Sequence, residues 1–229
     1  MTGTIVNTAT IIAGASAGFL LKRGIPDRYK TTIIQGLSLA VIVIGLQMAL
    51  QTKNILIMVL SLVLGGLTGE LLKVEERLDA FGYRMETMFG KPGSSFTKGF
   101  VTASLVYCVG AMAIVGSIQD GINGNPNTLF VKSVLDGVSA VVFASTLGIG
   151  VAFSALSVLI YQGSITLLAW YLQGILTPPI IGELTATGGV LIMAIGLRLL
   201  EIKDIKVGNL LPAMGYSLLL AALLPKAWL

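Results

Sequence analysis

The sequence contains no histidine, a single cysteine and few charged residues, and each shortage excludes a class of function. Without histidine, both the commonest metal ligand and the commonest acid–base catalyst are missing. The one cysteine, Cys108, cannot form a disulfide within the chain, and its apolar surroundings favour a packed side chain over a nucleophile. We therefore expect neither a bound metal nor a cofactor.

The shortage of charge is the most informative of these features. Charged residues make up 11% of the 229 residues, whereas a soluble domain typically carries about 25%. The chain is 55% hydrophobic with a mean hydropathy of +0.89. Apolar runs of about 20 residues, long enough to cross a bilayer, recur along its length. The sequence predicts an all-α polytopic helical membrane protein that forms a single transmembrane domain over residues 1–229.

We predict about eight membrane spans, or seven with a re-entrant or broken pair. A single helix over residues 131–176 would be too long for one crossing, so a tight hairpin or a broken, re-entrant pair is expected at Gly148-Ile149-Gly150. Gly148 and Gly150 are the candidate helix-break glycines. The predicted spans are Thr4–Leu21, Lys30–Leu50, Asn54–Leu72, Lys98–Ile118, Val131–Gly148, Ala152–Ile175, Glu183–Leu200 and Val207–Leu224.

The distribution of positive charge predicts an orientation. The first ten residues lack the positively charged region of a signal peptide, so we expect the first span to be retained. With the N-terminus outside, twelve of the fifteen Lys and Arg residues lie on the inside, and Lys53, Lys132 and Lys226 lie outside. This bias fits the positive-inside rule. No basic cluster indicates a nucleic-acid partner.

The longest predicted loop, residues 73–98, has the pattern of a helix. Its apolar residues recur at intervals of three and four: Val74, Leu78, Phe81, Met85 and Met88. This spacing places one apolar stripe along a helix. A helix lying in the cytoplasmic membrane interface fits the pattern, and so does a gating or partner-binding element.

A weak internal similarity suggests a duplication. Ile44-Gly45-Leu46 and Ile195-Gly196-Leu197 each precede a Lys-Asn or Lys-Asp turn and a further apolar span. In the predicted topology the two hairpins run in opposite directions. This would make the first three and last three spans an inverted repeat, an architecture of many secondary transporters. Chance similarity between apolar helices is the alternative, and a competing echo links residues 35–38 with 136–139.

Several polar residues fall in or near the predicted spans, where an ionisable group is costly and usually partnered. Asp136 lies about one and a half turns into the fifth span. Asp120 and Gln119 follow the fourth span on the same predicted side, so they could approach Asp136 and form a site for a proton or a hard cation. The structural alternative for Asp120 is a helix stop and turn.

Two further acids lie near span ends. Glu70 is close to the cytoplasmic end of the third span, and Glu183 opens the predicted seventh span. For Glu183 the structural alternative is a favourable acid in the first turn of its helix. Both are candidate ion or substrate residues.

The sixth predicted span carries a polar stripe. Ser154, Ser157, Tyr161 and Ser164 follow a three-four-three spacing, with Gln162 beside them. Such a stripe either lines a polar path or joins helices by hydrogen bonds. Tyr161 and Gln162 are the candidate substrate wall.

The chain resembles a bacterial integral membrane family called domain of unknown function 554. The resemblance covers essentially the whole chain, and the strings GSIQDG, LDG, ASTLGIGV and YQG carry it. It implies a multi-span inner-membrane protein and assigns no substrate.

These observations favour a secondary transporter, an ion- or proton-coupled carrier for a small solute or ion. The alternatives are a non-transporting membrane scaffold or regulatory subunit, and a passive ion channel. An enzyme is not expected, because the nucleophile-elbow and nucleotide-loop motifs are missing. The partners expected are the lipid bilayer, the solute or cation, and a second copy of the chain in a homodimer.

Overall fold

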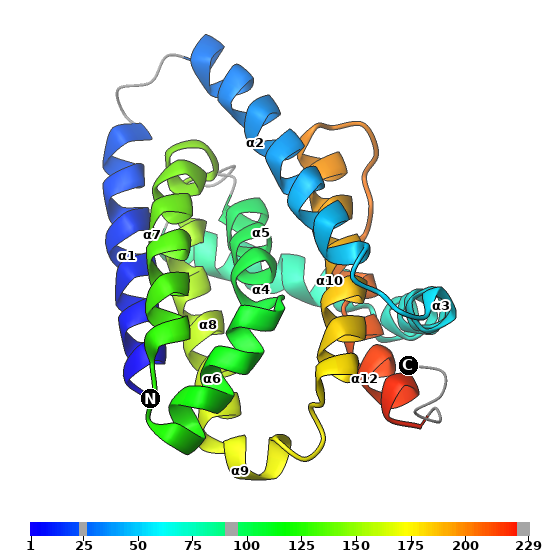
Figure 1. Cartoon of the computed structure of the whole chain (residues 1–229). Coiled ribbons are helices and arrows are strands. Elements are labelled where there is room, and N and C mark those ends of the chain that lie inside the picture. The colour runs from blue at the N-terminus through cyan, green and yellow to red at the C-terminus, as the bar shows by residue number, and fades with distance from the viewer. Residues whose placement is uncertain (23–26, 90–95, 224–229) are drawn as a thin grey trace. The chain divides into compact units, whose positions relative to one another are not determined.

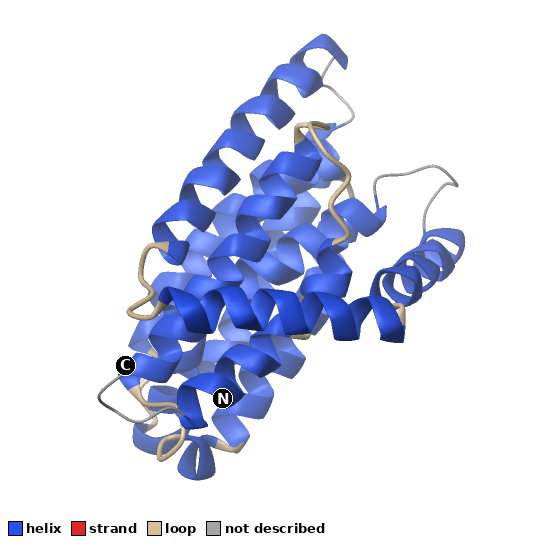
Figure 2. Ribbon diagram, turned by 90° about the vertical axis from the view of Figure 1, so that its right-hand side faces the viewer, coloured by secondary structure: helices blue, strands red, loops and turns tan. Residues whose placement is uncertain are grey.

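A computed structural model of the chain describes residues 1–22, 27–89 and 96–223. Every regular element within those ranges is a helix (Figure 2). The helices, labelled in Figure 1 except for α11, are α1 (Thr2–Lys22), α2 (Asp27–Ala49), α3 (Ile55–Leu72), α4 (Val74–Phe89), α5 (Phe96–Cys108), α6 (Ala111–Asn123), α7 (Asn127–Leu147), α8 (Gly150–Leu167), α9 (Ala169–Leu172), α10 (Pro178–Leu199), α11 (Val207–Leu210) and α12 (Ala213–Leu223).

Six helices are long and apolar enough to cross a membrane: α1, α2, α3, α7, α8 and α10. The polytopic helical class predicted from the sequence is therefore confirmed, with six or seven candidate spans within the described ranges. The seventh would be α5 with α6, which are bent by 59°. The last predicted span falls on a shorter apolar segment, Val207–Leu223, and residue 224 lies outside the described residues.

The chain divides into two compact units, each made of two separate stretches. Unit 1 is Met1–Ile34 with Phe81–Gly174, and unit 2 is Gln35–Ala80 with Ile175–Leu229. Two of the three boundaries fall within α2 and α4, and the third lies between α9 and α10. The single transmembrane domain remains a prediction.

Glycines explain where two of the helices break. Gly148 has φ 84°, a conformation that side chains disfavour, and it ends α7 just before α8 begins at Gly150. A Cβ added to Gly150 would overlap the backbone of Phe96, so glycine at this position allows close packing. The predicted break at these residues is present. A second break, which the sequence did not predict, falls at Gly110 between α5 and α6, where φ is 137°.

In unit 1, contacts between α1 and its neighbours fix the relative helix directions. Gly14 approaches Gly137 and Gly18 approaches Val141, so α1 and α7 run parallel, side by side (Figure 1). The glycines at 14 and 18 let the backbones meet, as expected for a small-residue packing face. If α2 and α3 each cross the membrane, a parallel α7 requires α5 and α6 together to make one crossing, which corresponds to the seventh candidate span.

In unit 2, α2 and α10 cross antiparallel at glycines. A Cβ on Gly45 would lie 2.6 Å from the carbonyl oxygen of Gly189, and one on Gly196 would lie 2.9 Å from that of Ser38. Gly65 and Gly69 of α3 similarly contact Ala213 and Asn209. Close backbone contact therefore joins α2 to α10 and α3 to the α11–α12 segment.

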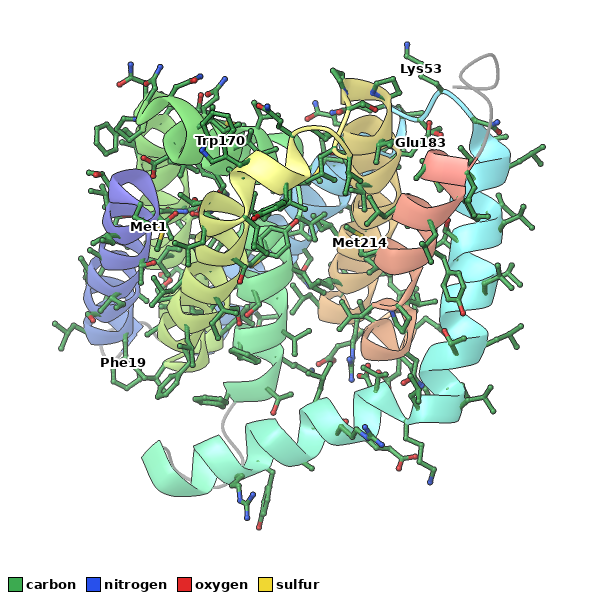
Figure 3. The ribbon with its side chains drawn as sticks, turned by 90° about the horizontal axis from the view of Figure 1, so that it is seen from below. Met1, Phe19, Lys53, Trp170, Glu183 and Met214 are labelled. Atoms are coloured by element: carbon green, nitrogen blue, oxygen red, sulfur yellow. The ribbon has the colours of Figure 1, made fainter. Side chains whose placement is uncertain are left out.

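The amphipathic loop predicted from its spacing forms the helix α4. Lys73, in the left-handed conformation at φ 52°, ends α3. Figure 3 shows the change of direction between α3 and α4. Glu75 then anchors α4, because it accepts hydrogen bonds from Arg198 and from the backbone N–H of Gly208, each at 2.5 Å. Of the predicted stripe, the side chains of Phe81, Met85 and Met88 lie outside the described residues.

Candidate functional site

A buried group of four polar side chains lies among the helices of unit 1. It consists of Asn7 on α1, Lys132 and Asp136 on α7, and Gln162 on α8, and we call it the Asp136 cluster. Their exposed fractions are 0%, 6%, 5% and 0%, respectively. Each of the three helices is long and apolar enough to cross a membrane. The cluster therefore places an ion pair and two amides in predominantly apolar segments.

Asp136 is nearer the middle of its helix than the sequence predicted. Because α7 begins at Asn127 and not at Val131, Asp136 is nine residues, or about 14 Å, from the start of the helix. That depth is close to half of a hydrocarbon core of about 30 Å. The prediction of one and a half turns was therefore wrong, and the acid lies about two and a half turns deep.

The partner of Asp136 is a lysine one turn away on the same helix. Lys132 Nζ lies 2.9 Å from Asp136 Oδ1 and 2.8 Å from Oδ2. Asn7 Nδ2 donates to Oδ2 at 3.0 Å. An isolated buried charge would cost several kcal/mol, and the ion pair and amide offset that cost. Both carboxylate oxygens therefore have partners.

The side-chain amides of Asn7 and Gln162 extend this network, and one polar atom of each has no hydrogen-bond partner within the described ranges. Asn7 Nδ2 also donates to Gln162 Oε1 at 3.3 Å. The carboxylate fixes the orientation of the Asn7 amide, since only the nitrogen can donate to it, and this in turn presents Gln162 Oε1 to Asn7. Among the described residues, Asn7 Oδ1 and Gln162 Nε2 have no hydrogen-bond partner. Such unpaired buried atoms are rare and call for an explanation.

Asp120 is not part of the Asp136 cluster, although it contacts α1, the helix that carries Asn7. It accepts from the backbone N–H of Gly3 at 3.0 Å and lies 3.0 Å from the amino group of Met1. Gly3 is one turn before Asn7 on α1, so the two acids contact successive turns of one helix. Gln119 is separate, because its Oε1 accepts from Thr128 at 2.7 Å.

The helix-stop interpretation of Asp120 is wrong. The helix α6 continues through Gln119, Asp120 and Gly121 and ends after Asn123, where Gly124 at φ 61° caps it. Asp120 is 5% exposed, and Gly121 packs against the backbone of Thr166. The glycine after the acid therefore serves helix packing and not a turn.

The side chains of the predicted stripe on α8 do not line one common surface. Ser157 accepts a hydrogen bond from Ser104 at 3.0 Å, Tyr161 is half-buried, and Ser164 is exposed. Within the described part of the chain no hydrogen bond joins Tyr161 to the Asp136 cluster. Gln162, on the adjacent face, is the member of the predicted substrate wall that reaches the acid site.

The remaining two acids belong to unit 2 and bind connecting segments. Glu183 is 1% exposed and accepts from Thr52 Oγ1 at 2.7 Å and from the N–H groups of Lys53 and Asn54 at 2.7 and 3.1 Å. Figure 3 shows Glu183 near Lys53, on the turn between α2 and α3. It is not a first-turn acid, because α10 begins at Pro178, a residue suited to a helix start.

Glu70 contacts the chain that leads into α11. It accepts from Lys206 Nζ at 2.9 Å and from Asn209 Nδ2 at 2.6 Å. The hydrogen bond and charge of Glu70 raise the pKa of Lys206 above its usual value. Glu70 is largely exposed, so this pair is a surface link with little effect on stability.

Lys132 is a member of the Asp136 cluster that sequence reasoning did not single out as a candidate. It was counted as an outside charge because the fifth span was started too late. The signal was present, since an acid four residues after a lysine lies on the same helix face. No group of three or more Cys, Asp or Glu side chains suited to a metal is found among the described residues.

Comparison with known proteins places the chain in a family. The model of the family described as "Protein of unknown function (DUF554)" matches residues 2–222. The chain belongs to this family. No solved structure matches it.

Two curated relatives extend over almost the whole chain. One, from Bacillus subtilis (strain 168), is named "Uncharacterized membrane protein YdfK" and is 35% identical over 218 residues, 93% of each chain. The other, from Escherichia coli (strain K12), is named "Uncharacterized protein YqgA" and is 32% identical over 231 aligned residues, covering 99% of this chain and 97% of the relative. Membership of the family and the apolar helices together identify a membrane protein.

Proposed function

We propose that the protein is a secondary carrier for a small solute or ion, coupled to a proton or a small cation at the Asp136 cluster. The observation that carries this proposal is the buried Lys132–Asp136 pair beside the unpaired Asn7 Oδ1 and Gln162 Nε2. Ionisable residues inside membrane helices typically mark ion or substrate paths. Here the acid is near the middle of its helix, the depth at which carriers bind their ions.

An inverted repeat is part of this proposal, and the α2–α10 crossing supports it. Gly45 contacts Gly189 and Met193, whereas Gly196 contacts Ser38 and Ile42. The same shift along the chain that carries Gly45 to Gly196 also carries Ser38 to Gly189 and Ile42 to Met193. Each contact is thus the counterpart of the other, as a two-fold axis between the helices would require.

The proposed setting is the bacterial inner membrane, with the N-terminus outside. The excess of Lys and Arg at the predicted cytoplasmic ends supports this orientation. In that orientation, the start of α7 at Asn127 and the turn between α2 and α3 are both on the outer side. The protein would then admit its ion from the side on which Lys132 lies.

The proposal is tested by electrical recording from liposomes containing the purified protein, adsorbed on a solid-supported membrane. Rapid changes of pH, NaCl or KCl, alone and with panels of amino acids, sugars and carboxylates, should give saturating transient currents. Asp136→Asn should reduce these currents to the level of empty liposomes. The double variant Lys132→Met/Asp136→Asn should do the same without leaving an unpaired buried lysine.

Ser133→Ala is the matched control. Ser133 is also buried on α7, but its hydroxyl bonds to the carbonyl of Leu129 on its own helix. Currents should therefore persist. Wild-type protein that gives no current in any condition would contradict a carrier and favour a scaffold, and non-saturating single-channel currents would favour a channel. Currents unchanged by Asp136→Asn would remove the acid from the mechanism.

A further inference from the structure

In the Asp136 cluster, the ammonium group of Lys132 pairs with the carboxylate as a bound monovalent cation would. Lys132 Nζ bonds both oxygens of the carboxylate, at 2.9 and 2.8 Å, and occupies the position that a small cation would take. One carboxylate balances one positive charge, so the site as built is matched to a monovalent ion. A divalent ion would leave uncompensated charge in a buried position.

The position of Lys132 near the start of α7 would let its ammonium group reach water when it leaves Asp136. It is five residues, or about 7.5 Å along the helix axis, from the start of α7 at Asn127. Lysines near helix ends extend their long side chains to the membrane interface and keep the ammonium group in water. Release of the carboxylate would therefore transfer the ammonium group to water, and the incoming cation would pair with the carboxylate in its place.

The carboxylate oxygens remain when the ammonium group leaves, and amide oxygens belong to the side chains hydrogen-bonded around them. The Asp136 carboxylate is the charged ligand, and Gln162 Oε1 lies one amide away from it through Asn7. The unpaired Asn7 Oδ1 adds a further buried acceptor within the same side chain that contacts the carboxylate. Carboxylate and amide oxygens are the ligands that hard cations prefer. An unpaired acceptor here is what a cation site needs and a static ion pair does not.

We propose that Lys132 is an internal cation that occupies Asp136 in exchange with an alkali-metal cation, Na⁺ or K⁺, held by Asp136, Asn7 and Gln162. This rests on the carrier proposed above and names its coupling ion. In one state the ammonium group pairs with the carboxylate. In the other the metal ion takes its place and Lys132 extends to the membrane interface. Each exchange replaces one positive charge by another.

The exchange has a measurable consequence for affinity. A site that is available for only a fraction of the time binds its ligand more weakly by that fraction. If Lys132 occupies Asp136 more than nine-tenths of the time, then removing the lysine charge should tighten alkali-cation binding at least about tenfold. A lysine that serves only as a structural partner predicts no such gain.

The test uses the purified full-length protein in detergent, with thermal unfolding measured by intrinsic tryptophan fluorescence. NaCl, KCl and LiCl are titrated against N-methyl-D-glucamine chloride at constant ionic strength, because a ligand of the folded state raises Tm by mass action. Lys132→Met should show stabilisation by one of the alkali cations at a midpoint at least about tenfold below that of the wild type. Lys132→Arg should behave like the wild type.

Removal of the acid is the deciding control. Lys132→Met/Asp136→Asn should lose the cation-specific stabilisation while remaining folded. If Lys132→Met itself fails to fold, then the wild type against Asp136→Asn decides, since the wild type should be weakly stabilised by the same cation and Asp136→Asn should not.

Equal stabilisation with and without Asp136, or no alkali-specific stabilisation in folded Lys132→Met, would overturn the proposal. This experiment measures cation binding, whereas the electrical recording measures transport. A carrier without cation exchange would give currents but no alkali-specific stabilisation. A cation site without transport would give the stabilisation but no currents.

Discussion

Asp136 in unit 1 and Glu183 in unit 2 are both buried acids inside apolar helices, but their partners differ in kind. Glu183 accepts from two backbone N–H groups and a threonine hydroxyl, all on one turn that cannot leave it without unfolding locally. Asp136 accepts from the tips of two side chains, one of which is a long lysine. Burial of an acid therefore does not identify a transport site by itself. The proposal for Asp136 rests instead on partners that are side-chain tips and can move away from the carboxylate.

The largest expected effect is on stability, at Glu183. Glu183→Ala removes three hydrogen bonds to a charged acceptor, and we expect the free energy of unfolding to fall by about 2–4 kcal/mol. Thr52→Val removes one of these bonds and should cost about 1 kcal/mol. Unfolding in mixed detergent–SDS micelles would measure both. A stable Glu183→Gln variant that loses its transport currents would break the comparison, since Glu183 would then act as Asp136 is proposed to act.

A second prediction sharpens the comparison through helix packing. Gly14→Ala forces α1 away from α7, and Gly45→Ala forces α2 away from α10, so each should lower the free energy of unfolding by about 1–3 kcal/mol. Gly14→Ala should also weaken the currents of folded protein, because Asn7 and Asp136 lie on the two separated helices. Gly45→Ala should leave the current per folded molecule unchanged.

The matched control for these glycine variants lies on α2. Gly36 has nothing within 4 Å of an added Cβ, so Gly36→Ala should stabilise the helix by up to about 1 kcal/mol. Thermal unfolding and the electrical recording described above measure both properties. Equal loss of current in the Gly14 and Gly45 variants would show that the site depends on both crossings.

The smallest expected effect concerns Asp79 on α4, outside the membrane-spanning helices. Burial, and then the negative charge of Glu75, raise the pKa of Asp79. An acid whose pKa is raised on folding destabilises the folded state above its unfolded pKa and loses that penalty as the pH falls. Asp79→Asn should therefore raise Tm at pH 7 by no more than about 1–2 °C, and by less at pH 4. A larger gain at pH 4 than at pH 7 would contradict this.

Much of the fold could be predicted because the bilayer imposes a length and a composition on each span. Six of the predicted spans correspond to helices, and the glycines at 148 and 150 mark a real break. The break at Gly110 could not be predicted, since an isolated glycine in an apolar run is as compatible with packing as with a bend. Only the conformation at φ 137° distinguishes the two.

The site was harder to predict than the fold. The sequence singled out Asp136 and Gln162, but it could not show that Asn7 joins them, because Asn7 is 129 residues from Asp136 along the chain. Hydrophobic periodicity reports which face of a helix is polar and says nothing about which helix it meets. Glu183 and Asp120 were misread for a related reason, since a span boundary in error by a few residues moves an acid from a helix interior to its end.

The division of each unit into two stretches has a consequence for how the protein is made. Ribosomes deliver α1 to the membrane more than a hundred residues before α7 and α8, so Asn7 must wait in the bilayer for the groups that satisfy it. The helices α2 and α3 likewise wait for α10. Neither unit can be completed before the later part of the chain has been inserted. Until then, the polar and glycine faces of the first three helices must be covered by lipid or by other membrane components.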